Sequence, residues 1–130
     1  MKKLLALRKS KKGFTLVEII VVIAIIAILA AITIPTMAGF ISKANEAQAL
    51  TDARAVYVAA QAEAMSSDTD FAGTIDAADA TAINVWIGET LVTATNTTVT
   101  TVDGKVTALT FTDGTYTATY ADGEFTTSKN

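Results

Sequence analysis

A run of apolar residues near the N-terminus constrains the fold more than any other feature. Residues 19–34 read IIVVIAIIAILAAITI and contain no charged side chain. Phe14, Leu16 and Val17 extend the apolar surface toward the N-terminus, so that the segment 14–34 has 21 residues. As an α-helix it would be about 31 Å long at roughly 1.5 Å per residue, enough to cross the hydrocarbon core of a bilayer. The sequence therefore predicts a transmembrane helix.

Basic and acidic residues are distributed unequally on the two sides of Gly13. Six of the ten basic residues precede it, and all thirteen acidic residues follow it. The basic residues before Gly13 are Lys2, Lys3, Arg8, Lys9, Lys11 and Lys12. Such a cluster is typical of a segment that stays in the cytoplasm while the rest of the chain crosses the membrane. Its removal would change the formal net charge from −3 to −9, counting side chains only, which argues against a nucleic-acid partner because phosphate binding needs clustered Lys or Arg.

An ordinary secretory signal peptide is an alternative for this N-terminal segment, and three features count against it. The apolar run is longer than the usual h-region of about 7–15 residues. Glu18 lies near the start of the run. The helical pattern also continues beyond the end of the run.

Apolar residues go on recurring every three or four positions after the transmembrane segment, as on one face of a helix. They are Phe40, Ala44, Ala47, Leu50, Ala53, Tyr57, Ala60 and Ala64. We therefore predict one helix from Phe14 to about Ala64, roughly 75 Å long at the standard rise. Its first half, residues 14–35, is the transmembrane part, and its second half, residues 36–65, is amphipathic.

Two residues weaken the middle of the predicted helix. Pro35 removes one backbone hydrogen bond, and Gly39 lowers helix propensity further. We expect a kink or a meltable stretch here. Ser66, Ser67 and Asp68 are predicted to end the helix, because their side chains compete for backbone hydrogen bonds.

The C-terminal part of the chain predicts an antiparallel β-meander over residues 98–130. Asp-Gly pairs occur at 103–104, 113–114 and 122–123, between segments rich in Thr, Val, Tyr and Phe. Asp-Gly suits two-residue type I′ hairpin turns, whose central residues both need positive φ.

These turns define the expected register and the apolar face of the sheet. A two-residue turn at 113–114 would pair Phe111 with Tyr116, and the turn at 122–123 would pair Tyr120 with Phe125. The first turn would also pair Leu109 with Ala118 and Thr107 with Tyr120. One face then collects Leu109, Phe111, Tyr116, Ala118, Tyr120 and Phe125, while threonines fill much of the other.

The predicted fold class follows from these elements. It is α+β, with the long N-terminal helix packed through its amphipathic half on the apolar face of a small antiparallel meander. The connecting region, residues 66–97, is expected to hold a short helix or an irregular loop, with Trp86 and Ile87 against the core.

The residue inventory offers little to catalysis or metal binding. The chain has no histidine and no cysteine, so the usual nitrogen and sulfur ligands of transition metals are missing. Asp68, Asp70, Asp76 and Asp79 could bind calcium in principle, but their spacing matches no known loop, and a solvated acidic loop is the better interpretation. We therefore predict no enzyme activity, no cofactor and no metal site.

The stretch GFTLVEIIVVIAIIAILAAITIP, residues 13–35, resembles the N-terminus of type IV prepilins and related pseudopilins, the class III signal peptide. Lys12 and Gly13 stand before the cleavage point of that signal, Phe14 after it, Glu18 at its acidic position and Pro35 at the end of its apolar run. The resemblance implies cleavage between Gly13 and Phe14 by a prepilin peptidase and N-methylation of Phe14. It also implies assembly of many copies, on a pilus assembly platform, into a helical filament with the long helices inside.

Beyond Ala64 nothing resembles this family, and the paired cysteines of many Gram-negative major pilins are missing. That departure leans toward a pilin of a Gram-positive or anaerobic organism, or toward a pseudopilin. The main hypothesis is a structural subunit of a type IV pilus, a single-pass protein of the inner or plasma membrane and later part of an extracellular pilus or envelope-spanning fibre. The alternatives are a pseudopilin of a type II secretion or DNA-uptake system, and a membrane-anchored binding module that forms no filament.

Glu18 places a carboxylate at the start of the membrane segment, which costs up to about 3 kcal/mol on insertion scales and less near the interface. After cleavage, the new Phe14 amine of an adjacent copy could neutralise it, and only one axial stagger of the two subunits would bring the charges together. The local alternative is that Glu18 complements the dipole of its own helix or pairs with its own terminal amine. Both roles can coexist.

The role of Gly13 can be tested with Gly13→Leu. A peptidase that cuts at the membrane surface must admit extended backbone, and glycine has no side chain to clash with the enzyme. We expect this variant to accumulate as the full-size precursor on an immunoblot. A normally processed band would contradict the cleavage role.

Overall fold

The computed structural model describes residues 13–67 and 70–130. The chain falls into two units, one that ends at Gly39 and one from Phe40 to Asn130, and each is described by itself. The basic residues 2–12 and Asp68, which the sequence analysis singled out, lie outside the described residues.

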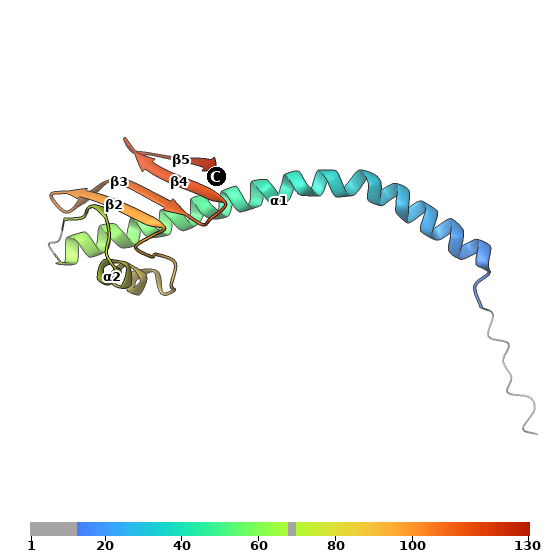
Figure 1. Ribbon diagram of the computed structural model, residues 1–130, viewed down its shortest axis with the longest axis horizontal. Helices are drawn as coiled ribbons and strands as arrows, with labels where there is room; N and C mark the ends of the chain where they lie inside the picture. Colours follow the sequence, from blue (N-terminus) through green and yellow to red (C-terminus); the bar gives the residue numbers. More distant parts are fainter. Residues whose placement is uncertain (1–12, 68–69) are drawn as a thin grey trace, which may run out of the picture. The chain divides into compact units, whose positions relative to one another are not determined.

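Helix α1 runs without interruption from Leu16 to Ser67, 52 residues, with Pro35 inside it (Figure 1). This confirms the prediction of one long helix; it begins two residues later and ends three residues later than expected. Its most apolar stretch has a mean hydropathy of 3.1, and the helix is long and apolar enough to cross a membrane.

The part of α1 up to Gly39 exposes almost all of its side chains. Its threonine hydroxyls are satisfied within the helix: Thr33 Oγ1 donates to the carbonyl oxygen of Leu29 at 2.7 Å, and Thr36 Oγ1 donates to that of Thr33 at 2.8 Å. Internal satisfaction of polar groups is what a helix surrounded by lipid requires. This part of α1 is therefore suited to an apolar environment.

The second unit packs a five-stranded sheet and a short helix on the C-terminal part of α1 (Figure 1). The further elements are β1 (Ala72–Thr74), α2 (Ala77–Ile87), β2 (Thr97–Val102), β3 (Lys105–Thr112), β4 (Tyr116–Ala121) and β5 (Glu124–Lys129). The strands lie in the order β1-β2-β3-β4-β5 and every neighbouring pair is antiparallel. The predicted α+β class and meander are confirmed.

Two of the three Asp-Gly turns have the predicted form. Asp103 and Gly104 have φ of 53° and 71°, and Asp122 and Gly123 have φ of 53° and 87°. Both are two-residue turns with positive φ at each central position, as type I′ demands. The turn at 122–123 pairs Tyr120 with Phe125, as expected.

The turn at 113–114 differs, and the predicted β3–β4 register is wrong by two residues. Phe111 pairs with Ala118 rather than Tyr116, and Leu109 pairs with Tyr120 rather than Ala118. The Asp113 carboxylate causes the longer loop, since its Oδ1 accepts from the backbone N–H groups of residues 115 and 116, each at 2.7 Å. Gly114 has a positive φ of 98°, but Asp113, which forms this Asx turn, does not, so the loop is not a two-residue type I′ turn. The proposed pairing of Thr107 with Tyr120 fails for the same reason.

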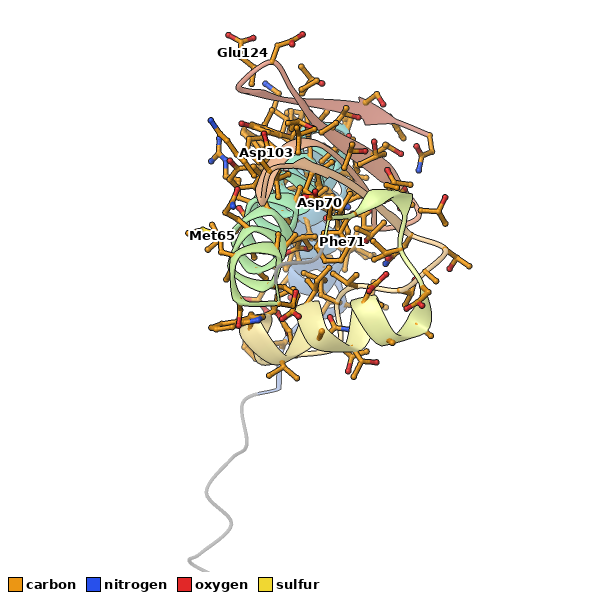
Figure 2. All side chains as sticks on the ribbon, turned by 90° about the vertical axis from the view of Figure 1, so that its left-hand side faces the viewer. Met65, Asp70, Phe71, Asp103 and Glu124 are labelled. Carbon is orange, nitrogen blue, oxygen red and sulfur yellow. The ribbon has the colours of Figure 1, made fainter. Side chains whose placement is uncertain are left out.

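The predicted apolar face of the sheet is nevertheless correct, because a shift of two residues leaves every side chain on its original face. Leu109, Phe111, Tyr116 and Ala118 are buried, while Tyr120 and Phe125 are half-buried against the core. In Figure 2, Phe71 lies between the sheet, α1 and α2, where these three elements enclose the core.

The stripe predicted on the amphipathic half of α1 is correct only in its later part. Ala53, Ala60 and Ala64 are buried and Tyr57 packs against the core. Phe40, in contrast, is 69% exposed, and Ala44 and Ala47 are also exposed. The buried residues of α1 are Ala49, Ala53, Val56, Ala59, Ala60 and Ala64. Alanine occurs on several faces of this helix, so periodicity alone could not select the buried face.

The region 66–97 contains β1 and α2. Helix α2 begins with a capping box, in which Asp76 accepts from the N–H of Asp79 at 2.9 Å and the Asp79 carboxylate accepts from the N–H of Asp76 at 3.1 Å. Ile87 packs against the core as expected. Trp86 does not: it is 54% exposed, and its indole N–H donates to Glu63 Oε2 at 2.8 Å.

The side-chain amide of Gln61, on α1, makes two hydrogen bonds to the backbone of the β2–β3 hairpin. Its Nε2 donates to the carbonyl oxygen of Gly104 at 2.6 Å, and its Oε1 accepts from the N–H of Val106 at 2.9 Å. One side-chain amide therefore satisfies two backbone groups at the end of the sheet.

An aromatic cluster lies between α1 and strands β4 and β5, at the edge of the core. The rings of Tyr57 and Tyr120 have centroids 4.5 Å apart, and Phe125 lies 4.8 Å from Tyr120. The guanidinium of Arg54 lies 5.7 Å above the Phe125 ring. The hydrogen bond with Tyr120, together with partial burial, raises the pKa of Tyr57 above its ordinary value.

We expect Gln61→Ala to lower the free energy of unfolding by about 1–3 kcal/mol, because it leaves two partly buried backbone groups without partners. Urea denaturation of the full chain in detergent micelles, followed by the fluorescence of its single tryptophan, measures the effect. Gln48→Ala is the matched control: Gln48 bonds only the exposed Asp52, and its loss should cost less than about 0.5 kcal/mol. Equal effects of the two substitutions would contradict the anchoring role.

Candidate functional site

The start of α1 is a capping box built from Thr15 and Glu18. The Thr15 carbonyl accepts the first helical hydrogen bond, from Ile19 N at 3.3 Å, as the residue at the N-cap does. Thr15 Oγ1 accepts from the N–H of Glu18 at 3.2 Å. In return, Glu18 Oε2 accepts from Thr15 N at 2.8 Å and from Thr15 Oγ1 at 2.9 Å. The two residues thus satisfy backbone donors that a helix start would leave free.

This capping box was not identified from the sequence, although its signal is present. Thr15 and Glu18 form the pattern T-x-x-E directly before an apolar run, which is a sequence signature of a helix start. The local alternative considered for Glu18, a role at its own helix N-terminus, is therefore what the structure contains.

The capping bonds use one carboxylate oxygen of Glu18. All of them involve Oε2, and no partner for Oε1 is found in the part of the chain that the structure describes. The capping box therefore fixes the orientation of the carboxylate and leaves a second oxygen open to another group.

Gly13 and Phe14 lie in non-helical backbone immediately before the capping box. Phe14 is 84% exposed, and a methyl group added at Gly13 would meet no atom of the described residues within 4 Å. The packing of the chain itself thus places no demand for glycine at this position. The bond between these residues is accessible and is not part of a helix.

Apolar side chains lie beside Glu18, which is itself exposed. A surface hollow of about 580 Å³ is lined by Phe14, Val17, Glu18, Ile19, Val21 and Val22. A charge in such a setting is poorly solvated once the helix lies in lipid or protein, so it favours a counter-charge.

Pro35 and Gly39 lie apart from this site. Pro35 is 17 residues beyond Glu18, about 26 Å along the helix at the standard rise. Without an N–H, Pro35 leaves the carbonyl of Ala31 without its helical donor. A methyl group at Gly39 would meet no atom within 4 Å, so local packing does not require glycine there either.

The acidic residues considered for calcium are used elsewhere. Asp70 accepts from Thr101 Oγ1 at 3.0 Å and from Gly104 N at 3.1 Å, while Asp76 and Asp79 cap α2. Within residues 13–67 and 70–130, no three acidic side chains gather in a way that could hold a metal ion.

Comparison with known families adds a finding at this end of the chain. Residues 8–34 match the family model described as the prokaryotic N-terminal methylation motif. This motif is the class III signal peptide of type IV pilins and pseudopilins, so the chain carries the N-terminal segment of a type IV pilin-like or pseudopilin precursor. The motif implies processing by a prepilin peptidase and membrane-associated assembly, and it suggests a structural subunit. Searches of curated proteins and of solved structures gave no significant match.

The effect of Pro35 on the stability of α1 can be tested with Pro35→Ala. The new N–H can bond the carbonyl of Ala31, and proline costs about 3 kcal/mol more than alanine inside a helix. We therefore expect the backbone amides of residues 36–39 to exchange with deuterium at least tenfold more slowly in micelles. Ile34→Ala, which keeps Pro35, is the control. Unchanged exchange in Pro35→Ala would show that the proline does not loosen the helix.

Proposed function

We propose that this chain is a structural subunit of a type IV pilus, cut between Gly13 and Phe14, N-methylated at Phe14 and polymerised through its N-terminal helix. The observation that carries the proposal is the exposed apolar part of α1, which directly follows the methylation motif and begins with an oriented carboxylate. An apolar surface of this extent needs lipid before assembly and protein after it.

The proposed site of assembly is the pair formed by Glu18 of one copy and the Phe14 amine of another. Cleavage creates that amine on Phe14, four residues before Glu18 in the same chain. In the right stagger, the helix of a neighbour brings its own Phe14 amine to this Glu18. The capping box already orients the carboxylate, so little entropy is lost when its open Oε1 meets the cation. A subunit in the wrong stagger would leave the carboxylate unpaired in an apolar setting, which is costly.

Pro35 and Gly39 complete the proposal as the flexible segment of the helix. The carbonyl left free by Pro35 and the low helix propensity of Gly39 reduce the cost of local unwinding. Subunits could then adjust their helices on transfer from the bilayer to the fibre, while the second unit keeps its fold.

A pseudopilin of a type II secretion or DNA-uptake system is the second candidate, because the methylation motif fits it equally. In both cases the subunit is inserted in the membrane before assembly. Electron microscopy of surface fibres, with mass spectrometry of the purified protein, separates the two: long fibres made of this chain support the pilus, and a short envelope-confined fibre supports the pseudopilin.

Glu18→Ala tests the assembly role. We expect normal cleavage on an immunoblot but loss of incorporation into filaments, because the Phe14 amine of the neighbour loses its counter-charge. Thr15→Ala is the matched control: it weakens the same capping box by about 1 kcal/mol and keeps the carboxylate.

If capping were the only role of Glu18, the two variants would assemble equally well or equally poorly. A normal yield of filaments from Glu18→Ala would exclude the proposed pair altogether.

A further inference from the structure

An apolar groove runs between α1 and α2 on the second unit. It has a volume of about 460 Å³ and is lined by Arg54, Ala55, Val58, Ala59, Ala62, Trp86 and Ile87. Alanines from α1 form its floor, so the backbone of another helix could approach closely, as small residues allow wherever helices pack tightly.

Two residues that line this groove are exposed, and one of them is held by a side-chain hydrogen bond. Val58 is 65% exposed and Trp86 is 54% exposed. The indole of Trp86 is held by its hydrogen bond to Glu63, 2.8 Å from nitrogen to oxygen. The aromatic wall is therefore oriented before anything binds, which lowers the entropy lost on binding.

The exposed side of α1 in this unit shows the spacing of a helix-packing surface. Its residues recur at alternating intervals of three and four: Ile41, Ala44, Gln48, Thr51, Ala55, Val58, Ala62 and Met65. In Figure 2, Met65 points away from both the sheet and α2. Six of these eight positions are apolar, the exceptions being Gln48 and Thr51. An apolar 3.5-residue repeat is typical of a surface that packs against another α-helix.

The same repeat continues in the sequence of the N-terminal half of α1. Counting back from Ile41, its positions are Met37, Ile34, Ala30, Ala27, Ile23, Ile20 and Leu16, all apolar. The open surface of the second unit is thus continuous in pattern with the helix that drives the proposed polymerisation.

We propose that the groove between α1 and α2 receives the N-terminal helix of a second copy of this chain, around residues 24–31. This rests on the proposed function, since it names the surface that one subunit offers to the helix of another. The segment AIIAILAA is uncharged and has four alanines, so it matches the apolar, alanine-lined groove in chemistry. It is also part of the helix whose most apolar stretch is not buried within its own chain.

The groove assigns a role to α2 in assembly. Trp86 and Ile87 form one wall, so the partner helix would contact the globular unit as well as α1. Burial of the exposed face of Trp86, which lies on α2, would add apolar contact to that made by Val58 and the other α1 residues of the groove.

Disulfide cross-linking within filaments tests this proposal, because the chain has no cysteine of its own. Val58→Cys is combined in turn with cysteine at Ala27, Ile28, Leu29 and Ala30, which together sample one helical turn. We expect a ladder of covalent oligomers from one or two of the four pairs. Ala55→Cys, one turn away in the same groove, repeats the series in case Val58→Cys folds poorly. Val102→Cys, an equally accessible valine on β2, is the control and should give no ladder.

The outcomes separate this inference from the proposed function. The groove is not the docking surface if filaments form but neither groove position gives a ladder, or if Val102→Cys gives an equal ladder. In either case the proposal that the chain is a filament subunit is unaffected. If the parent chain forms no filament, both proposals fail.

A matched pair of charge substitutions gives an independent measurement. Val58→Glu should reduce the yield of filaments by about tenfold or more, since it would place an unpaired charge in the buried contact. Val102→Glu, with 55% exposure against 65% for Val58, should assemble like the parent. Parental yield from Val58→Glu would overturn the inference.

Discussion

The contact of the N-terminal helix with an apolar surrounding is the constraint on which the molecule depends. In the described part of the chain, nothing covers the first 24 residues of α1, and its most apolar stretch is wholly unburied. A soluble monomer would expose far more apolar surface than solution tolerates. The helix must therefore lie in lipid or against other proteins, and a chain that carries a methylation motif at this point is equipped to pass from one to the other.

The capping box shows how a single carboxylate can serve two purposes. Oε2 of Glu18 completes the first turn of α1 with Thr15, so the charge does not depend on a neighbour to be stabilised. Oε1 remains available, and its position is set by the capping bonds. The cost of keeping a charge near lipid is thus reduced in the single chain, and the proposed pairing with a partner's amine would lower it further. Local and intermolecular roles, treated as alternatives in the sequence, are compatible in the geometry.

Predictions from the sequence were correct where a short pattern of residues determines the local conformation. The long helix follows from apolar periodicity, and the turns at 103–104 and 122–123 follow from Asp-Gly and positive φ. The predictions failed where two local solutions compete: at 113–114 the Asp113 side chain bonds the backbone and lengthens the loop. Strand β1 has three residues, Ala-Gly-Thr, and its place in the sheet comes from pairing with β2 rather than from any propensity of its own. At the site, Gly13, Phe14 and Glu18 were found from the family motif, whereas the capping role of Thr15 needed the structure.

The failure of the predicted α1 stripe has a physical cause that bears on assembly. Ala53, Ala60 and Ala64 face the core while Ala55 and Ala62 line the open groove, so the helix is alanine-rich on two sides. Alanine adds little buried area but loses no side-chain entropy and permits short interhelical distances. The core consequently depends on large residues from the sheet and α2, such as Phe111, Leu109 and Ile83. Small residues toward the core let α1 lie close to its own sheet and α2. Small residues on the groove side would do the same for the helix of a second copy, as the proposed docking requires.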